Sequence, residues 1–221
     1  MKDIMQWILY ELIVYNPVNK KVRYGRRMDG GYVIVDGYDY DLFISCGIGK
    51  DVSFEVDFCK NHKINGFAFD GTVDDPVLPD GIRFVKKNIT KNNDLNDYVK
   101  NYKNVFIKMD IERAEWEWIR NFNYFSKVKQ IVFEAHHTYT SGALDCLRKL
   151  NETHSLVHVS QNNNGKNYEH DGKVYPSLIE LTYLRKEIDG LNKTRFPIDG
   201  IDFKNIPSKP ELILDIWPFK S

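Results

Sequence analysis

Apolar and polar residues form alternating blocks along this chain, and the blocks predict a regular succession of strands and helices. Seven short apolar runs, several of them continuous, are typical of strands buried on both faces. The predicted strands are Leu42–Cys46, Gly66–Phe69, Ile82–Lys86, Val105–Met109, Gln130–Glu134, Leu156–Val159 and Leu178–Tyr183. Segments with helical spacing lie between them, near Ser53–Asn61, Asp94–Lys100, Glu115–Asn121 and Ala143–Leu150. This alternation predicts an α/β fold with a mostly parallel sheet and helices on both faces.

The two ends of the chain follow other patterns. Residues Ile4–Val14 have helical spacing and run toward Pro17, which predicts an N-terminal helix. The turn-rich segment 161–172 contains no helical pattern and predicts an antiparallel return strand at the sheet edge. After Asp189 the prolines indicate irregular chain that wraps the rest. We therefore expect one domain over 1–221, with an N-terminal helix within 1–22, a core over 23–185 and a wrapping tail over 186–221.

Charge and cysteine content narrow the class of protein. The chain has 31 basic and 31 acidic residues, and this balance disfavours nucleic acid as the main partner because phosphate binding usually requires a basic excess. The first apolar stretch is too short and too polar to span a membrane, and it lacks a signal-cleavage site. Three cysteines without CxxC spacing argue against disulfides or structural zinc. A cytoplasmic location is expected.

A glycine turn follows the first predicted core strand. Gly47 and Gly49 allow the backbone to approach a ligand closely, and a helix N-terminus follows directly. About twenty residues later, Asp70 ends the next strand, where a carboxylate can accept both hydroxyls of a ribose. The pair favours a nucleoside cofactor, although two glycines can also serve a bare strand–helix turn. A dinucleotide is less favoured because Val52 occupies the third glycine position.

Two later strands end in groups suited to acid–base or metal chemistry. Asp110 and Glu112 follow one strand, and Glu134, His136 and His137 follow its neighbour. Because parallel strands end at the same sheet edge, these side chains should converge there. Such oxygen and nitrogen ligands suit a divalent cation, and a spare carboxylate or imidazole could serve as a general base. The alternative is that they cap helices and hold one another by hydrogen bonds.

The ordered motifs resemble those of FkbM-type methyltransferases over about residues 23–185. The matching segments are Arg23–Arg26, Asp29–Val33, Gly47–Glu55, Phe69–Thr72, Lys108–Glu112 with Ala114–Trp116, Phe133–His136 and Glu180–Tyr183. Methyltransferase domains that accompany glycosyltransferases, including those of large algal viruses, are the most similar kind. The resemblance implies a Rossmann-like class I methyltransferase fold: a seven-stranded, mostly parallel sheet with an antiparallel edge strand. It implies S-adenosylmethionine as cofactor and a sugar hydroxyl, such as that of the deoxyhexose rhamnose, as acceptor.

The resemblance also implies roles for individual residues. The predicted cofactor-binding residues are Gly47, Gly49, Asp51 and Ser53 for the methionine moiety, Asp70 with Thr72 for the ribose, and Asn88 and Ile89 beside the adenine. Asp110, Glu134 and His136 would hold a divalent metal ion of the Mg or Mn type, which would orient two sugar hydroxyls. Glu112 would be the catalytic base, with His137 as the competing candidate. The chain could also be one domain of a longer glycan-processing polypeptide.

One position departs from the family pattern. Arg113 stands where glycine usually follows Ile-Glu. Its side chain would narrow the acceptor pocket, pair with Glu112 or contact an anionic substrate, and pairing would weaken Glu112 as a base. Tyr139 is a predicted substrate contact because it lies on a loop after the fifth strand.

Two other functions compete with methyl transfer to a small-molecule or glycan substrate. An NAD-linked oxidoreductase is disfavoured by Val52 and by the acid–histidine cluster. A methyltransferase-like fold that has become a binding or scaffold subunit is the second alternative, and Arg113 leaves it open. The residues that speak against it are the retained Gly47, Gly49, Asp70, Asp110 and Glu134. Stabilisation by S-adenosylhomocysteine or by NAD would separate these classes.

Overall fold

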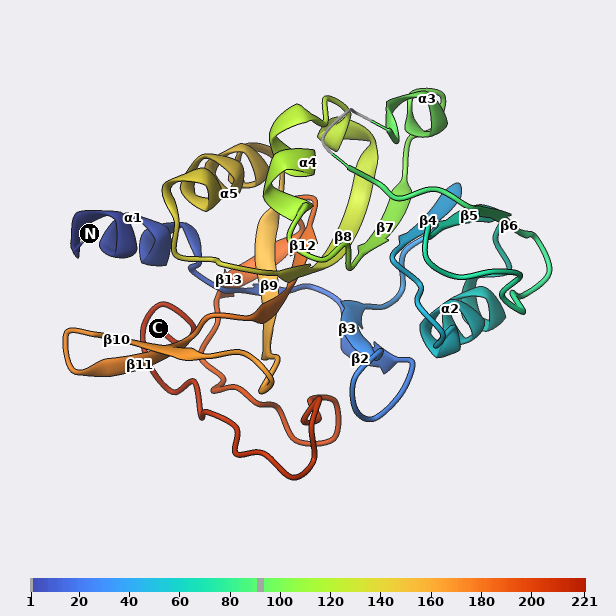
Figure 1. The fold of residues 1–221 in the computed structure, drawn as a ribbon. Helices are drawn as coiled ribbons and strands as arrows, with labels where there is room; N and C mark the ends of the chain where they lie inside the picture. Colours follow the sequence, from blue (N-terminus) through green and yellow to red (C-terminus); the bar gives the residue numbers. More distant parts are fainter. Residues whose placement is uncertain (1, 91–93) are drawn as a thin grey trace.

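A seven-stranded sheet forms the centre of the protein, which the computed structural model describes for residues 2–90 and 94–221 (Figure 1). From edge to edge the strands are β6 (Ile82–Val85), β5 (Gly66–Phe69), β4 (Leu42–Cys46), β7 (Val105–Met109), β8 (Val128–Ala135), β12 (Ile179–Leu184) and β9 (Ser155–Gln161). Each of these strands begins and ends within two residues of a predicted strand. The order turns back at β4, whose neighbours β5 and β7 both run parallel to it. This confirms the predicted Rossmann-like, mostly parallel sheet.

The position of the antiparallel strand corrects one expectation. β12 is antiparallel, as predicted, but it pairs with both β8 and β9 and is not the edge strand. The helix that joins β8 to β9 leaves a gap one strand wide between them. The chain beyond β9 is long enough to return, and β12 fills the gap. Its backbone N–H and C=O groups are therefore paired on both sides.

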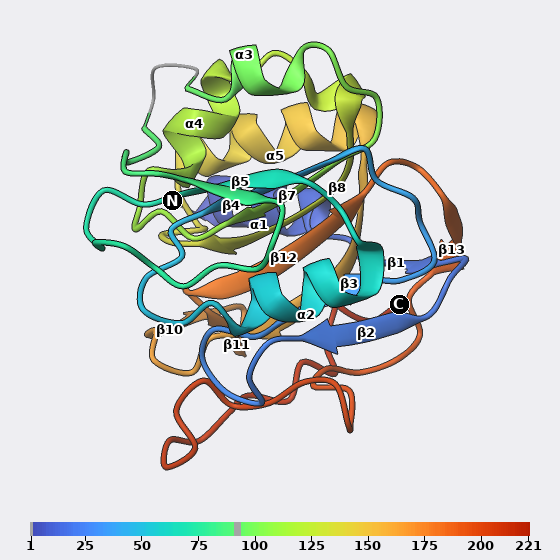
Figure 2. The same cartoon turned by 90° about the vertical axis from the view of Figure 1, so that its right-hand side faces the viewer.

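Helices cover both faces of the sheet (Figures 1 and 2). In the described part of the chain the helices are α1 (Lys2–Glu11), α2 (Ser53–His62), α3 (Asn96–Val99), α4 (Glu115–Asn121) and α5 (Ser141–Thr153), with a 3₁₀ turn at Phe125–Lys127. Successive residues of β4 and β7 point to opposite faces, so each strand contributes to two cores. Ile44 and Ile107 pack on the face of α4 and α5, whereas Phe43 and Phe106 pack with Phe58 of α2.

Three two-stranded units complete the fold. The first joins β1 (Tyr15–Pro17) to β13 (Ile188–Leu191), the second joins β2 (Lys21–Tyr24) to β3 (Tyr32–Val35), and the third joins β10 (Asn167–His170) to β11 (Lys173–Pro176).

The N-terminal helix α1 ends at Glu11, earlier than the predicted Val14. Val14 instead accepts a hydrogen bond from Asn192 N (2.9 Å), because the tail recruits this segment into pairing. None of the described helices is long and apolar enough to cross a membrane.

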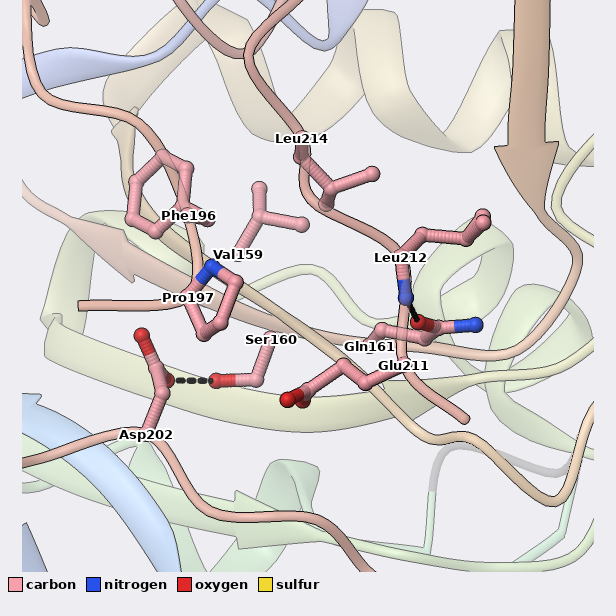
Figure 3. Close-up of a pocket in the computed structure, with 9 residues that line it drawn as sticks. All are labelled: Val159, Ser160, Gln161, Phe196, Pro197, Asp202, Glu211, Leu212 and Leu214. Atoms are coloured by element: carbon pink, nitrogen blue, oxygen red, sulfur yellow. Dashed lines mark hydrogen bonds between the residues drawn. The ribbon is translucent and has the colours of Figure 1, made fainter. Parts of the chain in front are cut away.

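The C-terminal tail packs against β9 through buried polar contacts (Figure 3). Asp202 Oδ1 accepts a hydrogen bond from Ser160 Oγ (2.6 Å) and lies 2.8 Å from His158 Nε2. Further along, Leu212 N donates to Gln161 Oε1 (2.5 Å). β13 extends two residues past Asp189, where irregular chain was predicted to begin. The contacts of Asp202 and Leu212 hold the chain after β13 beside the carboxyl end of β9.

Candidate active site

The glycine turn lies directly after β4 and contains two glycines in different surroundings. Both have positive φ, +70° at Gly47 and +55° at Gly49. A Cβ atom on Gly47 would lie 1.6 Å from the backbone oxygen of Asp110, so this glycine is required by the packing of β4 against β7. A Cβ atom on Gly49 would meet nothing within 4 Å. Gly49 therefore presents its backbone to open space, where a ligand can approach.

Asp70 ends β5 beside this turn. Its Oδ2 accepts a hydrogen bond from Gly49 N (2.9 Å), and its Oδ1 accepts from Thr72 N and Oγ1 (both 2.7 Å). Burial alone would raise the pKa of Asp70, but the hydrogen bonds from Thr72 and Gly49 outweigh it and lower the pKa below its ordinary value. The structure thus brings an ionised carboxylate and the glycine turn together, as the sequence spacing predicted.

The remaining predicted cofactor residues lie around this pair. Asn88 Oδ1 accepts from Gly71 N (2.8 Å), while Ile89 is buried in the core. Asp51 precedes α2, where its Oδ1 accepts from Ser53 N (3.1 Å) and its Oδ2 pairs with Arg26 (2.9 Å). The side chains of Asp51 and Asn88 have protein partners, whereas the buried Ser53 hydroxyl has none among the described residues. Contacts of all these residues with a cofactor stay predictions.

A cavity of about 880 Å³ opens at the ends of β7 and β8. Its lining comes from four parts of the chain: strand ends, the loop before β3, the segment around β10 and the tail. The charged, amide and aromatic residues of the lining include Arg26, Asp29, Asp51, Asp110, Glu112, Arg113, Glu134, His136, His137, Asn162, Tyr168 and Asn205. Asp51 belongs both to the cavity and to the start of α2. The cavity therefore adjoins the glycine turn, at the sheet edge where open α/β folds bind ligands.

Carboxylates form the floor of this cavity. Asp110 Oδ2 accepts a hydrogen bond from Tyr32 OH (3.1 Å), and Glu134 accepts one from Asn162. Glu134 is directly opposite Glu180 in the β8–β12 register. Burial, followed by the charges of Asp110 and Glu180, raises the pKa of Glu134 to about 9. Burial likewise raises the pKa of Glu180 to about 7. At neutral pH the Glu134 carboxyl is therefore protonated and Glu180 is partly protonated, so the floor has fewer negative charges than it has carboxyl groups.

The raised pKa of Glu180 predicts a pH-dependent stability. Between its ordinary value of 4.5 and about 7, the unfolded chain loses this proton and the folded chain keeps it, so stability falls as pH rises through this range. Glu180→Gln removes the effect. We expect the variant to gain on the order of 1–3 kcal/mol over wild type between pH 4.5 and 7.5, since one pKa unit corresponds to about 1.4 kcal/mol. Urea unfolding across this pH range measures it.

Glu187 provides a control of opposite sign. The hydrogen bond from Lys129 lowers the pKa of Glu187, so its contribution is present at neutral pH and is lost as pH falls. Glu187→Gln should therefore differ most from wild type at pH 7 and least in acid. If the free energies of unfolding of wild type and Glu180→Gln changed with pH in the same way, this result would contradict the interpretation of Glu180 as a buried, protonated carboxyl group.

His136 is held in a fixed orientation by a residue that sequence reasoning missed. Its Nδ1 lies 2.8 Å from Oε1 of Glu115, which is fully buried at the start of α4. Its Nε2 faces the cavity, 3.3 Å from Glu134 and 3.6 Å from Glu112. Burial would lower the pKa of His136, but the hydrogen bond and charge of Glu115 outweigh it and raise the pKa. The only signal for Glu115 was its place inside the quoted motif.

The two predicted bases lie on tight turns. Glu112 has φ +52° and a side chain that is 83% exposed, and His137 has φ +49°. Arg113 follows with φ +77°, which explains why glycine suits this position in the family pattern. Arg113 lines the cavity, and the described residues show no ion pair between it and Glu112. Of the three roles considered for Arg113, pairing with Glu112 is the one that this geometry does not support.

Tyr139 lies beside the cavity wall and does not line it. Its ring packs against those of Tyr168 (5.7 Å between centroids) and Tyr175 (6.4 Å). Tyr168 is the ring of this cluster that lines the cavity. Tyr168 therefore stands between Tyr139 and the cavity, and the predicted direct contact of Tyr139 with the substrate is not supported by this lining.

The predicted metal ligands converge without forming a metal site. Within 2–90 and 94–221, no group of three or more His, Cys, Asp or Glu side chains is arranged to hold a metal ion. Asp110 is turned toward Tyr32, Glu134 toward Asn162, and His136 toward Glu115. The residues as they stand do not fit the predicted metal.

Comparison with known proteins identifies no family for this chain. No family model and no curated protein matches the chain. Among solved structures, a precorrin-8w decarboxylase from Methanobacterium thermoautotrophicum is similar at 13% identity and a TM-score of 0.37, over 66% of this chain and 82% of that one. A precorrin-6y C5,15-methyltransferase from Geobacter metallireducens gives 14% and 0.39, over 67% and 82%. A tRNA (m1A58) methyltransferase from Aquifex aeolicus gives 11% and 0.37, over 66% and 62%.

With TM-scores of 0.37 to 0.39, these similarities indicate neither the family nor the substrate of this chain. The FkbM resemblance accordingly stays a prediction from the motifs.

Proposed function

We propose that this chain is an S-adenosylmethionine-dependent O-methyltransferase that acts on a hydroxyl of a sugar. The observation that carries the proposal is the Asp70–Gly49 pair: an ionised carboxylate, 2.9 Å from a backbone N–H of a turn that faces open space, beside a large polar cavity. A ribose offers two hydroxyl donors for such a carboxylate. Val52 in place of a third glycine supports a single nucleoside over a dinucleotide.

The lining of the cavity supports a polyhydroxylated acceptor. Carboxylates and amides from Asp29, Asp110, Asn162 and Asn205 surround a volume of about 880 Å³, and Tyr168 offers one aromatic face. Hydroxyl groups donate to carboxylates and exchange both kinds of hydrogen bond with amides.

The chain's own residues would position the acceptor and take its proton. S-adenosylmethionine supplies a methyl group on a cationic sulfur, which leaves as a neutral thioether. As the acceptor oxygen bonds to that carbon, its proton must pass to a base in the cavity. His136 has the orientation that this task needs, with Glu115 on Nδ1 and Nε2 facing the cavity. Glu112 and His137 remain the alternative bases, and no step is assigned to a metal.

Two measurements test the proposal in sequence. S-adenosylhomocysteine should raise the unfolding temperature by several degrees at saturating concentration, whereas NAD should leave it unchanged. Methyl transfer is then screened by mass spectrometry on nucleotide sugars, free glycans and small phenols, with and without EDTA. Stabilisation by NAD alone would favour an oxidoreductase, and no response to either ligand would favour a scaffold. Loss of transfer in EDTA, restored by Mg²⁺ or Mn²⁺, would establish the predicted metal.

A further inference from the structure

Lys108 is a buried lysine of β7 that lies beside the glycine turn. Its side chain is 5% exposed, and its Nζ donates a hydrogen bond to Gly47 O (2.8 Å). Glu55 of α2 lies 3.9 Å from the same nitrogen and is itself fully buried. Placing a lysine here costs desolvation free energy, which is tolerated only where the group has partners.

The bond to Gly47 fixes the orientation of one peptide in the turn. In a trans peptide the C=O and the next N–H point in opposite directions. With Gly47 O held toward Lys108, the N–H of Ile48 points away from Lys108. Glu55 anchors the lysine from the other side, since its Oε1 also accepts a hydrogen bond from Ser45 Oγ. The turn that faces the cofactor space is thus fastened from beneath to β7 and α2.

A second contact leads from Lys108 to the acceptor cavity. The Lys108 Nζ lies 5.4 Å from the ring centre of Tyr32, within the range of a cation–π interaction. The Tyr32 hydroxyl donates to Asp110 Oδ2 (3.1 Å), and Asp110 lines the cavity. One side chain therefore contacts the donor turn directly and the acceptor floor through a single intermediary.

We propose that Lys108 is a positioning residue that sets the glycine turn for the methyl donor and, through Tyr32, the carboxylate of Asp110 for the acceptor. The inference rests on the proposed methyltransferase function. It does not require Lys108 to touch either substrate. If Lys108 has this role, then replacing it weakens the binding of the methyl donor by more than the loss of folding stability accounts for.

Lys129 offers a matched control within the same sheet. It is a buried lysine of β8 that pairs with Glu187 and lies 4.2 Å from the ring centre of Tyr38. Lys129 thus has the same kinds of partners as Lys108. Lys129 lies near the amino end of β8, however, whereas the cavity lies at the carboxyl end of that strand. Each methionine variant removes a carboxylate partner and an aromatic contact, and only Lys108→Met also removes a hydrogen bond to the glycine turn.

The experiment measures the affinity of S-adenosylhomocysteine for the folded proteins by calorimetry. We expect Lys108→Met to weaken binding roughly tenfold or more, as for the loss of a charged hydrogen bond, and Lys129→Met to stay within twofold. Lys108→Arg keeps a cation and N–H donors, so it should retain more affinity than Lys108→Met. Tyr32→Phe should leave donor affinity within twofold and lower kcat/KM for the acceptor about tenfold.

The outcomes separate this inference from the function on which it rests. If wild type does not bind S-adenosylhomocysteine, the proposed function fails. If wild type binds and both methionine variants bind equally well, the positioning role is overturned. Should Lys108→Met not fold, Tyr32→Phe decides, and wild-type acceptor kinetics in that variant would overturn the positioning role.

Discussion

Asp70→Ala should reduce the affinity for S-adenosylhomocysteine by on the order of 100-fold, because two hydrogen bonds to a charged carboxylate would be lost. The same change removes the acceptor of the Gly49 N–H, so the turn also loses its tie to β5. Asp70→Asn keeps one oxygen for that N–H and removes the charge. It should therefore fall between wild type and Asp70→Ala. Calorimetric titration of the three proteins gives the order.

Asp74→Ala is the matched control for Asp70. Asp74 lies four residues later on the same loop, where it is exposed and pairs with Lys86. Exposed ion pairs contribute little to stability, so this variant should bind like wild type. If Asp70→Ala binds within threefold of Asp74→Ala, then Asp70 does not hold the ribose, and the nucleoside site would have to be sought elsewhere.

Gly47→Ala should destabilise the protein far more than Gly49→Ala, although the two glycines are only two residues apart. At Gly47 the new Cβ would overlap the backbone oxygen of Asp110, which cannot move without shifting β7. We expect a loss of more than about 4 kcal/mol, enough to prevent folding of a marginally stable domain. At Gly49 the methyl group meets open space, and the cost is roughly 1–2 kcal/mol for a left-handed alanine. Urea unfolding of the soluble variants compares them.

The same pair also tests where the cofactor lies. A methyl group on Gly49 projects into the space that a ligand would use, so Gly49→Ala should fold and yet bind S-adenosylhomocysteine more weakly. Equal stabilities of the two variants would contradict the packing argument. Unchanged affinity in Gly49→Ala would move the cofactor away from this turn.

Local pattern was enough to predict the seven strands of the sheet. β4 and β7 have the predicted bounds, Leu42–Cys46 and Val105–Met109, because a continuous apolar run between turn residues has few alternatives to a buried strand. Pattern also placed Gly47, Gly49 and Asp70 together, since consecutive parallel strands end at one edge. It predicted that the ends of β7 and β8 would converge in the same way.

Pairing over long distances could not be predicted in this manner. The sequence indicated that the strand near 178–183 is antiparallel, but its place between β8 and β9 depends on a gap left by other elements. β1 forms only because β13 pairs with it. In that pair Pro17 lies opposite Ile188, which is 171 residues later in the chain. Local spacing carries no information about such partners.

The sequence by itself determined the class of sheet, the edge at which the site lies and the residue types gathered there. Only the tertiary structure decided their partners: Glu115 on His136, Tyr32 on Asp110, Lys108 on Gly47 and the tail's Asn205 on Glu180. The physical reason is that strand periodicity and turn chemistry act over a few residues. A buried polar side chain, in contrast, takes whichever complementary group the packing brings within about 3 Å, however distant it is along the chain.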